Sequence, residues 1–436
     1  MKSDRRAPVA IIGGGFSGTM LAAQLARRGI NSLLIEGSGR GGLGTAYSTE
    51  EPAHVLNVRA EGMSAWPDDP GHFANAFGDP RGFAERKFFG RYLRSILDEA
   101  VKSGHVQLVV GQAVQAALGP EGWQVELDDG GKVEAQAVVL AIGNQPPEPL
   151  GIASGLSGRF INNPWGDEAK SAVREAASSG GDVLLIGTGL TMIDAVLSLN
   201  AAGHQGRIVA LSRRGQVPRA HADFAPAPIA MDEIPAGNVL ALWLWLRRRS
   251  GEVGWRAAVD SLRPHSQALW QGLSDGEQRR FLRHARPWWD VHRHRIAPQV
   301  TRQVHDRVAE GKLEIVAGRL GAMRAVDSDL EVEVQRRGGS VETRRFAFAI
   351  NCTGPLGNIE RTRDAMLRGL LDAGLVRPDP LGIGLAVDQD SRAIGADRLW
   401  ALGPLTKGRY WEIVAVPDIR EQAAAVAGDI AMELEK

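Results

Sequence analysis

The fold is decided by residues 8–18, which read PVAIIGGGFSG. The glycines with G-x-G-x-x-G spacing are Gly13, Gly15 and Gly18. A β-branched run precedes them, apolar residues recur with helical spacing after them, and the next apolar run, 32–35, ends in Glu36. This order predicts a β-α-β unit that binds a dinucleotide pyrophosphate at the positive end of its helix, with Glu36 placed to bond the ribose hydroxyls. The alternative interpretation is a Gly-rich turn in some other α/β fold.

A second unit of the same kind begins near residue 182, and its fingerprint is incomplete. A strand pattern over 182–186 enters a Gly-Thr-Gly turn, but the third glycine position holds Met192. Arg213 and Arg214 follow its second strand, where the first unit has Glu36. Guanidinium groups there would pair with a 2′-phosphate that a carboxylate would repel, so the sequence favours NADPH over NADH; otherwise the two arginines are a solvated surface. The residues predicted to bind NADPH are Gly187, Gly189, Thr191, Arg213 and Arg214.

Composition limits the possible partners. The 436 residues include 51 basic and 51 acidic side chains and are 44% apolar, which predicts at least two domains and no basic excess for nucleic acid or an anionic membrane. The most apolar internal stretch, 239–246, is too short to span a bilayer, so we expect a cytoplasmic protein with neither a nucleic-acid nor a membrane partner. The single cysteine, Cys352, excludes an intramolecular disulfide, a Cys-x-x-Cys pair and a multi-thiolate metal site. The oligomeric state stays open.

The remaining segments follow a recognisable order. Short alternating runs between 106 and 140 predict hairpin strands, and the last run leads to Gly143. From 215 to about 309 the composition shifts to Trp, His, Arg and Pro, with helical periodicity broken by prolines, which predicts a helical insert. A late apolar strand, 346–350, precedes Thr353 and Gly354.

This order of motifs resembles that of the two-dinucleotide flavoprotein superfamily over essentially the whole chain. Within it, several segments resemble the bacterial FAD/NAD(P)-binding family that includes flavin-dependent urate hydroxylases and an aspartate N-monooxygenase. The segments are Gly44-Thr45-Ala46-Tyr47, His54-Val55-Leu56-Asn57-Val58, Met63-Ser64 and Gly403-Pro404-Leu405-Thr406-Lys407-Gly408. The run Pro287-Trp288-Trp289-Asp290-Val291-His292-Arg293-His294-Arg295 also resembles a motif of this family.

The resemblance implies an α/β fold with two Rossmann-like dinucleotide-binding domains of the three-layer ββα type. Residues 1–165 and 345–436 would form a discontinuous FAD-binding domain, and 166–344 an NAD(P)-binding domain that includes the insert at about 215–309. The residues implied to bind FAD are Gly13, Gly15, Gly18, Glu36, Thr45, Asn57, Met63, Gly143, Gly354 and Gly403. A helix from about Pro417 would point its positive end toward the flavin pyrimidine. Many relatives have Gly-Asp where this chain has Gly403-Pro404, so the group that holds the ribityl chain stays open.

The implied activity is that of an FAD-dependent NAD(P)H oxidoreductase. The leading hypothesis is a monooxygenase that hydroxylates a small polar molecule with molecular oxygen through a flavin hydroperoxide. One alternative is an NAD(P)H-dependent reductase that passes electrons to a quinone or a protein acceptor. Another is a non-catalytic flavin redox sensor whose nicotinamide site is vestigial because of Met192.

The insert supplies the candidate residues of a substrate pocket, which are His292, His294, Arg295 and Trp289. The alternative is that this segment packs between the domains with its histidines satisfied by hydrogen bonds. His292 and His294 alternate as metal ligands can, but no carboxylate or thiolate cluster completes a site, so no metal is expected. Trp243 and Trp245, in the middle of an apolar helix, are expected in the core rather than in a substrate pocket.

Overall fold

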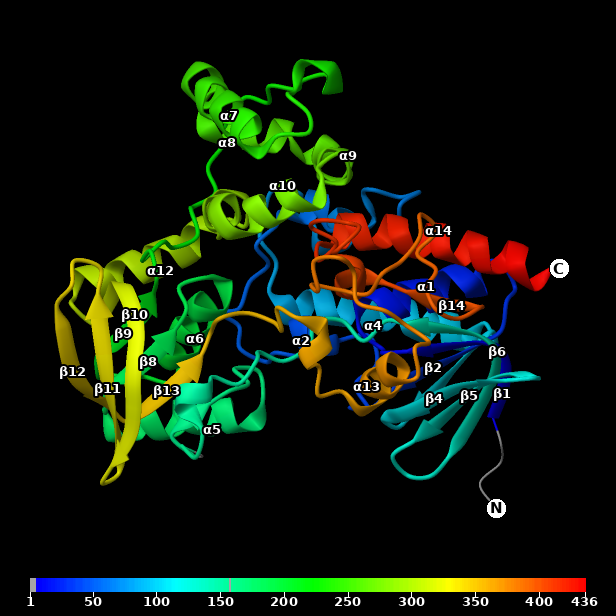
Figure 1. Cartoon of the computed structure of the whole chain (residues 1–436), viewed down its shortest axis with the longest axis horizontal. Helices are drawn as coiled ribbons and strands as arrows, with labels where there is room; N and C mark the ends of the chain where they lie inside the picture. Colours follow the sequence, from blue (N-terminus) through cyan, green and yellow to red (C-terminus); the bar gives the residue numbers. More distant parts are fainter. Residues whose placement is uncertain (1–4, 157) are drawn as a thin grey trace.

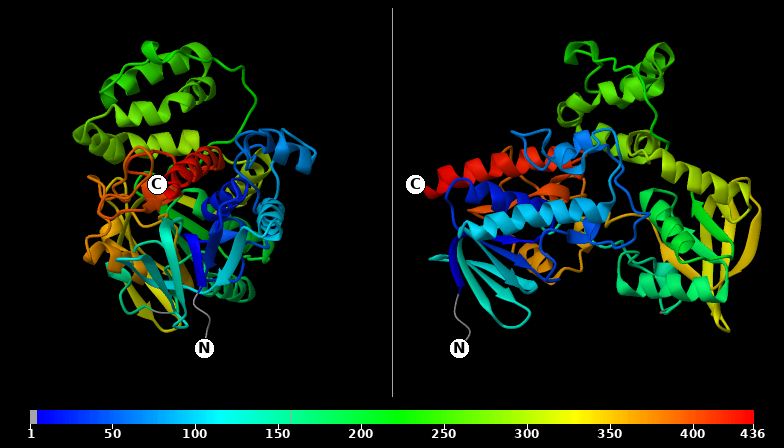
Figure 2. Two further views of the ribbon diagram at one scale, coloured as in Figure 1. Left: turned by 90° about the vertical axis from the view of Figure 1, so that its right-hand side faces the viewer. Right: turned by 180° about the vertical axis from the view of Figure 1, so that it is seen from behind.

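The computed structural model describes residues 5–156 and 158–436. Two lobes lie side by side, each built on one sheet, and a group of helices stands over the junction between them (Figures 1 and 2). The chain begins in the lobe on the right of Figure 1, passes through the left-hand lobe and returns, so that β1 and α14 share one lobe. The prediction of an α/β fold with two Rossmann-like domains is confirmed.

The first sheet carries the first fingerprint. Its strands are β1 (Arg5–Ile12), β2 (Ser32–Glu36), β3 (Val106–Val110), β4 (Ala113–Gly119), β5 (Gly122–Leu127), β6 (Lys132–Leu140) and β14 (Leu399–Ala401). The order is β3-β2-β1-β6-β5-β4, with β14 also paired to β6. Ile12 lies opposite both Ile35 and Leu140 in parallel pairings, so the carboxyl ends of these strands share one edge. The strand order reverses at β1, which is where open α/β sheets bind their ligands.

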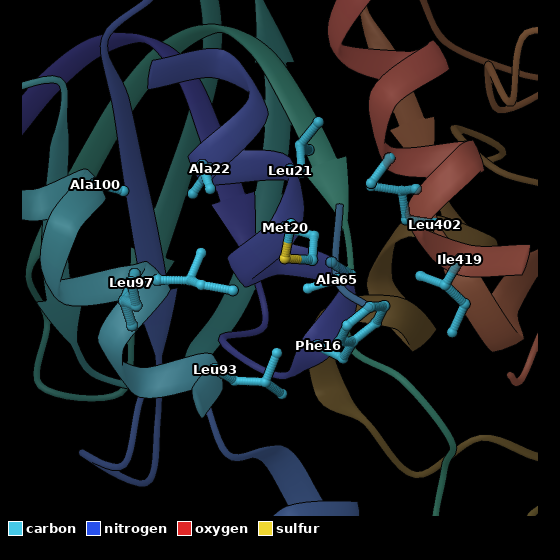
Figure 3. Close-up of a cluster of buried hydrophobic side chains, with 14 of the residues drawn as sticks. Phe16, Met20, Leu21, Ala22, Ala65, Leu93, Leu97, Ala100, Leu402 and Ile419 are labelled. Atoms are coloured by element: carbon cyan, nitrogen blue, oxygen red, sulfur yellow. The ribbon is translucent and has the colours of Figure 1, made fainter. Parts of the chain in front are cut away.

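Three helices cover one face of this sheet, and they fix where the first fingerprint points. They are α1 (Phe16–Ala26), α4 (Arg86–Lys102) and α14 (Val416–Leu434). Met20 of α1, Leu97 of α4 and Ile419 of α14 lie in the shared core shown in Figure 3. Each fully buried side chain of this size contributes about 1.5–3 kcal/mol relative to exposure, so the core holds the beginning of α1 at the sheet edge. The opposite face packs against α13 (Ala365–Asp372).

The second sheet repeats this plan. Its strands are β7 (Phe160–Ile161), β8 (Val183–Ile186), β9 (Ile208–Ser212), β10 (Leu313–Val326), β11 (Asp329–Arg336), β12 (Val341–Phe346) and β13 (Phe348–Asn351). The order is β12-β11-β10-β9-β8-β13-β7. One face packs against α5 (Asp167–Ser179), α6 (Leu190–Ala201) and α12 (Pro298–Ala309). In the second sheet β8 lies between β9 and β13, with parallel pairing on both sides. This matches the place of β1 between β2 and β6 in the first sheet.

The strand pairings shift the expected borders. Phe160–Ile161 and Phe348–Asn351 both belong to the second sheet, so the chain crosses between lobes before residue 160 and after residue 351 rather than at 165 and 345. The last helix of the expected insert, α12, packs on the second sheet through Val300 and Val304. The helical group over the junction therefore ends before α12.

That helical group lies over the junction of the lobes (Figure 2). Its helices are α7 (Val239–Val253), α8 (Trp255–Ser261), α9 (Ser266–Gln271), α10 (Asp275–Arg280) and α11 (Arg286–Arg293), with a π-helical turn η5 (Phe281–Ala285) before α11. Asn238 and Ser274 cap α7 and α10 by accepting hydrogen bonds from backbone N–H groups. Two small apolar clusters, one around Trp270 and one around Trp245, hold the group together. The prediction that this insert is helical is confirmed.

The other short elements lie in the connecting loops. They are α2 (Gly44–Tyr47), α3 (His72–Phe77), η1 (Ala60–Gly62), η2 (Gly151–Ala153), η3 (Met231–Glu233), η4 (Arg263–His265), η6 (Ile359–Arg361) and η7 (Gly403–Thr406). Within residues 5–156 and 158–436, no helix has both the length and the apolar character needed to cross a bilayer.

Candidate functional site

The first fingerprint forms an open cradle at the beginning of α1. Gly13 has φ +108°, and a Cβ there would overlap the carbonyl oxygen of Ala141; a Cβ on Gly18 would overlap the carbonyl oxygen of Gly13. These two glycines are thus required by packing. Gly15 caps the helix with an ordinary φ of −78°, and its Cβ would meet only Gly44 Cα at 3.6 Å. The space in front of Gly15 is therefore free for a phosphate group at the positive end of α1, as the resemblance requires.

An acid stands at the edge of this cradle. The Glu36 carboxylate accepts hydrogen bonds from the backbone N–H groups of Ser38 at 3.0 Å and Arg40 at 2.9 Å. It lies over Gly14, because a Cβ on Gly14 would be 2.8 Å from Glu36 Cβ. Thr45 is exposed on α2, next to the Gly44 that faces Gly15. Glu36 and Thr45 thus flank the same opening.

Gly143 and Gly403 close the cradle from two further strands. Gly143 has φ +70°, follows the Ala141 that packs on Gly13, and has no atom within 4 Å of a built Cβ. Gly403 has φ +65°, and its Cβ would lie 2.6 Å from Ser17 Oγ on α1. Its N–H donates to Gln422 Oε1 at 2.8 Å, which ties the end of β14 to α14. Gln422 was not predicted from the sequence.

Asn57 and Met63 have different surroundings. Met63 is 3% exposed and belongs to the core under α1, so its side chain is a packing element. Asn57 is half-buried, and its carbonyl oxygen accepts a hydrogen bond from His221 Nε2 at 2.9 Å. Burial lowers the pKa of His221 to about 4, so this ring is neutral. The contact ties the beginning of the insert to the loop that precedes the first domain's α4.

The helix expected near Pro417 begins at Val416, and its first turn contains a carboxyl group. Burial raises the pKa of Asp418, and its Oδ2 is buried without a hydrogen-bond partner in the described part of the chain. The positive end of α14 is therefore accompanied by an acid that burial drives toward its neutral form.

The second fingerprint has the same backbone geometry as the first. Gly187 has φ +123°, and its Cβ would overlap the carbonyl oxygen of Cys352; Gly189 caps α6, with no atom within 4 Å of a built Cβ. Thr191 is half-buried in the first turn of α6. Met192 is fully buried in the core under the second sheet. The methionine therefore fills a core position and leaves the cradle open, which removes the main reason to regard the second site as vestigial.

Gly354 lies beside the second fingerprint rather than within the first. It follows β13, and Cys352, the residue directly after this strand, packs on Gly187 as Ala141 packs on Gly13. The chain then returns to the first lobe, and the N–H of Leu356 donates to Gln145 O at 3.2 Å. Cys352 is buried, and burial raises the pKa of its thiol, so it does not form a reactive thiolate.

A strongly basic cavity of about 540 Å³, here called the arginine pocket, lies at the end of β9. Its basic lining residues are Arg213, Arg214, Arg283, His284, Arg319, Arg336 and Arg337. Arg336 is neutralised by Glu314 at 2.6 Å and Glu342 at 2.7 Å. None of the other arginines forms an ion pair within the described ranges, so their charge is available to an anion. The predicted Arg213 and Arg214 are thus brought together with further cations that the sequence did not reveal.

The four candidate residues of the insert do not converge on one polar pocket. Arg295 is 3% exposed, forms an ion pair with Asp260 and donates from Nε to His292 O at 3.0 Å, so its donors are used inside the insert. Burial lowers the pKa of His294, which makes it a neutral packing residue. His292 and Trp289 line a cavity within the insert.

This second cavity, here called the aromatic cavity, has a volume of about 380 Å³ and lies within the insert. Six tryptophans contribute to its wall: Trp243, Trp255, Trp270, Trp288, Trp289 and Trp411. Trp243 is half-buried, packs against the apolar cluster around Trp270 and also lines the cavity. Trp245 is 8% exposed and is a core residue as expected. The lining of this cavity is mainly apolar and aromatic.

Glu412 joins this cavity to the first domain. It has φ +69°, is 7% exposed, and accepts hydrogen bonds from Trp289 Nε1 at 2.6 Å and Arg293 Nε at 3.1 Å. Trp411 stacks on Trp270 with ring centroids 4.8 Å apart. Residues 411 and 412 thus seat the insert on the segment that leads into α14.

The lobes themselves are joined by a buried ion pair. Arg86 of α4 lies 3.0 Å from Asp194 of α6, with side chains 14% and 8% exposed. His54 Nε2 lies 3.0 Å from the carbonyl oxygen of Asp194. The family-like segment around His54 therefore forms a contact between the two lobes.

Comparison with known proteins agrees with this geometry. Residues 10–145 match the protein family described as FAD-NAD(P)-binding. The chain is 29% identical over 214 residues to a Baeyer-Villiger monooxygenase, ATR8, of Stachybotrys chlorohalonatus. That match covers 44% of this chain and 32% of the relative, so it spans about a third of the relative's length.

Solved structures share the whole architecture. An ornithine N-hydroxylase from Kutzneria sp. 744, in complex with reduced FAD, NADP+ and L-ornithine, superposes with a TM-score of 0.68 at 15% identity over 98% of this chain and 100% of that one. A thioredoxin reductase from T. acidophilum superposes with a TM-score of 0.57 at 12% identity over 99% of this chain and 100% of that one. At these identities the likeness establishes the fold and leaves the reaction to the site.

Proposed function

We propose that this chain is an FAD-dependent oxidoreductase that is reduced by NADPH and hydroxylates a small molecule with molecular oxygen. The observation that carries the proposal is the pair of open cradles with opposite charges beyond them. Gly15 and Gly189 each leave free space at a helix N-terminus, and Glu36 flanks the first cradle, whereas Arg213 and the arginine pocket flank the second. A carboxylate suits the unphosphorylated ribose of FAD, and guanidinium groups suit the 2′-phosphate of NADPH.

The two lobes take the corresponding roles in this proposal. The first sheet with α1, α4 and α14 binds FAD through Gly13, Gly15, Gly18, Glu36, Thr45, Gly143 and Gly403, with Asn57 and Met63 shaping the adjoining loop. The second sheet binds NADPH through Gly187, Gly189, Thr191, Arg213 and Arg214. Gly354 marks the crossing between them, because its neighbour Leu356 bonds to the linker at Gln145.

The protein's own contribution is binding, positioning and exclusion of water. When bound, FAD supplies the hydride acceptor and the oxygen chemistry. The insert covers the junction, and its aromatic cavity offers an apolar compartment walled by Trp289 and Trp411. Lys407, in the segment before Trp411, has a pKa lowered by burial to about 8, so it can exchange a proton near neutral pH.

A reductase that reduces a quinone is the second candidate, because a planar apolar acceptor would also suit the aromatic cavity. Electron transfer through a Cys-x-x-Cys pair is not available to this chain, which contains only Cys352. The two candidates differ in whether an oxygen atom from O₂ enters the product.

The experiment that tests the proposal supplies the purified holoenzyme with NADPH and aromatic compounds under isotopically labelled O₂. A monooxygenase consumes NADPH faster in the presence of its substrate and places one labelled oxygen atom in the product. NADPH consumption that depends on an added quinone, with no label in any product, would favour the reductase.

A further inference from the structure

We propose that the aromatic cavity binds a neutral, ring-containing apolar molecule, and that this molecule is the substrate; the second statement rests on the function proposed above. The wall is made mainly of indole rings and leucine side chains from α7, α8, α9 and α11. A volume of about 380 Å³ lies within the range of small-molecule sites.

The polar groups in the wall are largely occupied, so the cavity selects against charge. Ser250 Oγ donates to Leu246 O at 2.7 Å and Ser266 Oγ donates to Leu262 O at 3.2 Å. His292 Nδ1 lies 2.7 Å from Trp288 O. Arg247 is the cationic member of the lining, and it is exposed to solvent. A carboxylate or ammonium group inside would lose its hydration with little in return.

The aromatic rings are held in place by contacts outside the cavity. Trp270 Nε1 donates to Gly408 O at 2.8 Å, and Trp289 Nε1 donates to Glu412 Oε1 at 2.6 Å. Trp243 and Trp288 lie edge to face with centroids 6.4 Å apart. Since the indole N–H groups of Trp270 and Trp289 are satisfied by the first domain, their rings form a preformed wall for a flat apolar partner.

One donor in the wall lacks a partner. Trp411 Nε1 is buried and makes no hydrogen bond in the part of the chain described. An unpaired buried donor costs about 1–3 kcal/mol. This nitrogen has almost no accessible surface, so it adds no polar contact for a molecule in the cavity.

The test measures binding to the holoenzyme without NADPH, using the fluorescence of N-phenyl-1-naphthylamine and its displacement by indole or benzoate. The proposal predicts saturable binding, displacement by neutral indole and little displacement by anionic benzoate. Trp288→Ala removes an exposed part of the wall, so it should fold normally and weaken binding by about tenfold. Ser250→Phe should block binding by filling the cavity. Leu244→Ala, on the 57% exposed face of α7, is the matched control and should leave binding unchanged.

Equal binding by the wild type, Trp288→Ala and Ser250→Phe would overturn the assignment of the cavity as the binding site. Binding as predicted, with no neutral aromatic compound accelerating NADPH oxidation by a holoenzyme that NADPH does reduce, would overturn its role as the substrate site. Failure of NADPH to reduce the flavin would instead refute the proposed function, so the failures are distinguishable.

The π-helical turn η5 contributes to the walls of both cavities. Arg283 and His284 line the arginine pocket, while Phe281 and Ala285 line the aromatic cavity. Phe281 also packs edge to face on Trp411, with centroids 5.3 Å apart. Single π-helical turns frequently lie at functional sites. We infer that occupancy of the two cavities is coupled through this turn.

Coupling is reciprocal: a ligand in the arginine pocket changes the affinity of the aromatic cavity by the same factor by which a ligand in the aromatic cavity changes the affinity of the arginine pocket. The dissociation constant of N-phenyl-1-naphthylamine should change about fivefold or more when the holoenzyme is saturated with 2′,5′-ADP, and should not change with 5′-AMP, which lacks the 2′-phosphate. Arg283→Ala should abolish the change while Arg248→Ala, on an exposed part of α7, should preserve it. An unchanged constant with 2′,5′-ADP in the wild type, or an undiminished change in Arg283→Ala, would overturn the coupling.

Discussion

Gly15→Ala should separate ligand binding from folding at the first cradle. The methyl group would meet only Gly44 Cα at 3.6 Å, an ordinary van der Waals distance, and the backbone at φ −78° suits alanine. Loss of a favourable helix cap costs about 1 kcal/mol, and the stiffer unfolded chain returns about 0.4–1 kcal/mol. The apoprotein should therefore unfold at nearly the same temperature as the wild type.

Binding should respond very differently. The methyl group occupies the space through which a pyrophosphate approaches the N–H groups of α1, and loss of one or two charge-assisted hydrogen bonds costs about 1.5–3 kcal/mol each. A total of about 3 kcal/mol corresponds to roughly a hundredfold increase in the FAD dissociation constant. Titration of apoprotein with FAD, followed by quenching of flavin fluorescence, measures it.

Gly18→Ala is the contrasting variant. Its methyl group would overlap the backbone oxygen of Gly13, so it should destabilise the fold even without FAD. The reasoning would be refuted if Gly15→Ala bound FAD like the wild type, or if its apoprotein lost as much stability as that of Gly18→Ala.

The other predictions concern the second cradle, a buried lysine and the domain junction. Arg213→Ala with Arg214→Ala should raise the KM for NADPH about tenfold or more and leave that for NADH nearly unchanged; equal effects in steady-state kinetics would contradict the 2′-phosphate assignment. Lys407→Met should stabilise the protein at pH 7, because burial lowers the lysine pKa from 10.5 to about 8 and so penalises the charged form. That penalty is complete below pH 8 and disappears above pH 10.5. A pKa shift of this size corresponds to about 3 kcal/mol at most. Urea unfolding should therefore show that Lys407→Met raises the free energy of unfolding at pH 7 and that this gain vanishes near pH 11. Arg86→Ala should lower the free energy of unfolding by about 3 kcal/mol, because it leaves Asp194 buried and unpaired. The double variant with Asp194→Ala should lose clearly less stability than the sum of the two single variants. Additive losses in thermal unfolding would show that the pair is not coupled.

The local patterns were sufficient to predict both dinucleotide cradles. The spacing of Gly13, Gly15 and Gly18 and the acid at Glu36 are encoded within a single β-α-β unit, so periodicity and turn chemistry reveal them. The incomplete second fingerprint suggested a weaker site because Met192 stands where a third glycine was expected. Met192 instead points into the core under the second sheet, a direction that the spacing alone does not give.

The substrate region could not be predicted in the same way. The aromatic cavity joins Trp243 of α7 to Trp411 of the C-terminal segment, and the bond from Trp289 to Glu412 spans 123 positions of the chain. Such contacts depend on how the insert seats on the first lobe, not on any local period. His294 and Arg295 looked like site residues because they are polar, but burial of His294 and the ion pair of Arg295 with Asp260 commit them to packing.

The central claim is that FAD in the first cradle receives hydride from NADPH in the second. The most direct measurement mixes the purified holoenzyme with NADPH, and separately with NADH, in the absence of oxygen and follows the visible absorbance of oxidised flavin. The account predicts that NADPH bleaches the flavin, that NADH does so far less efficiently, and that the Arg213→Ala, Arg214→Ala variant loses this preference. A bound flavin that neither nucleotide bleaches would contradict the account.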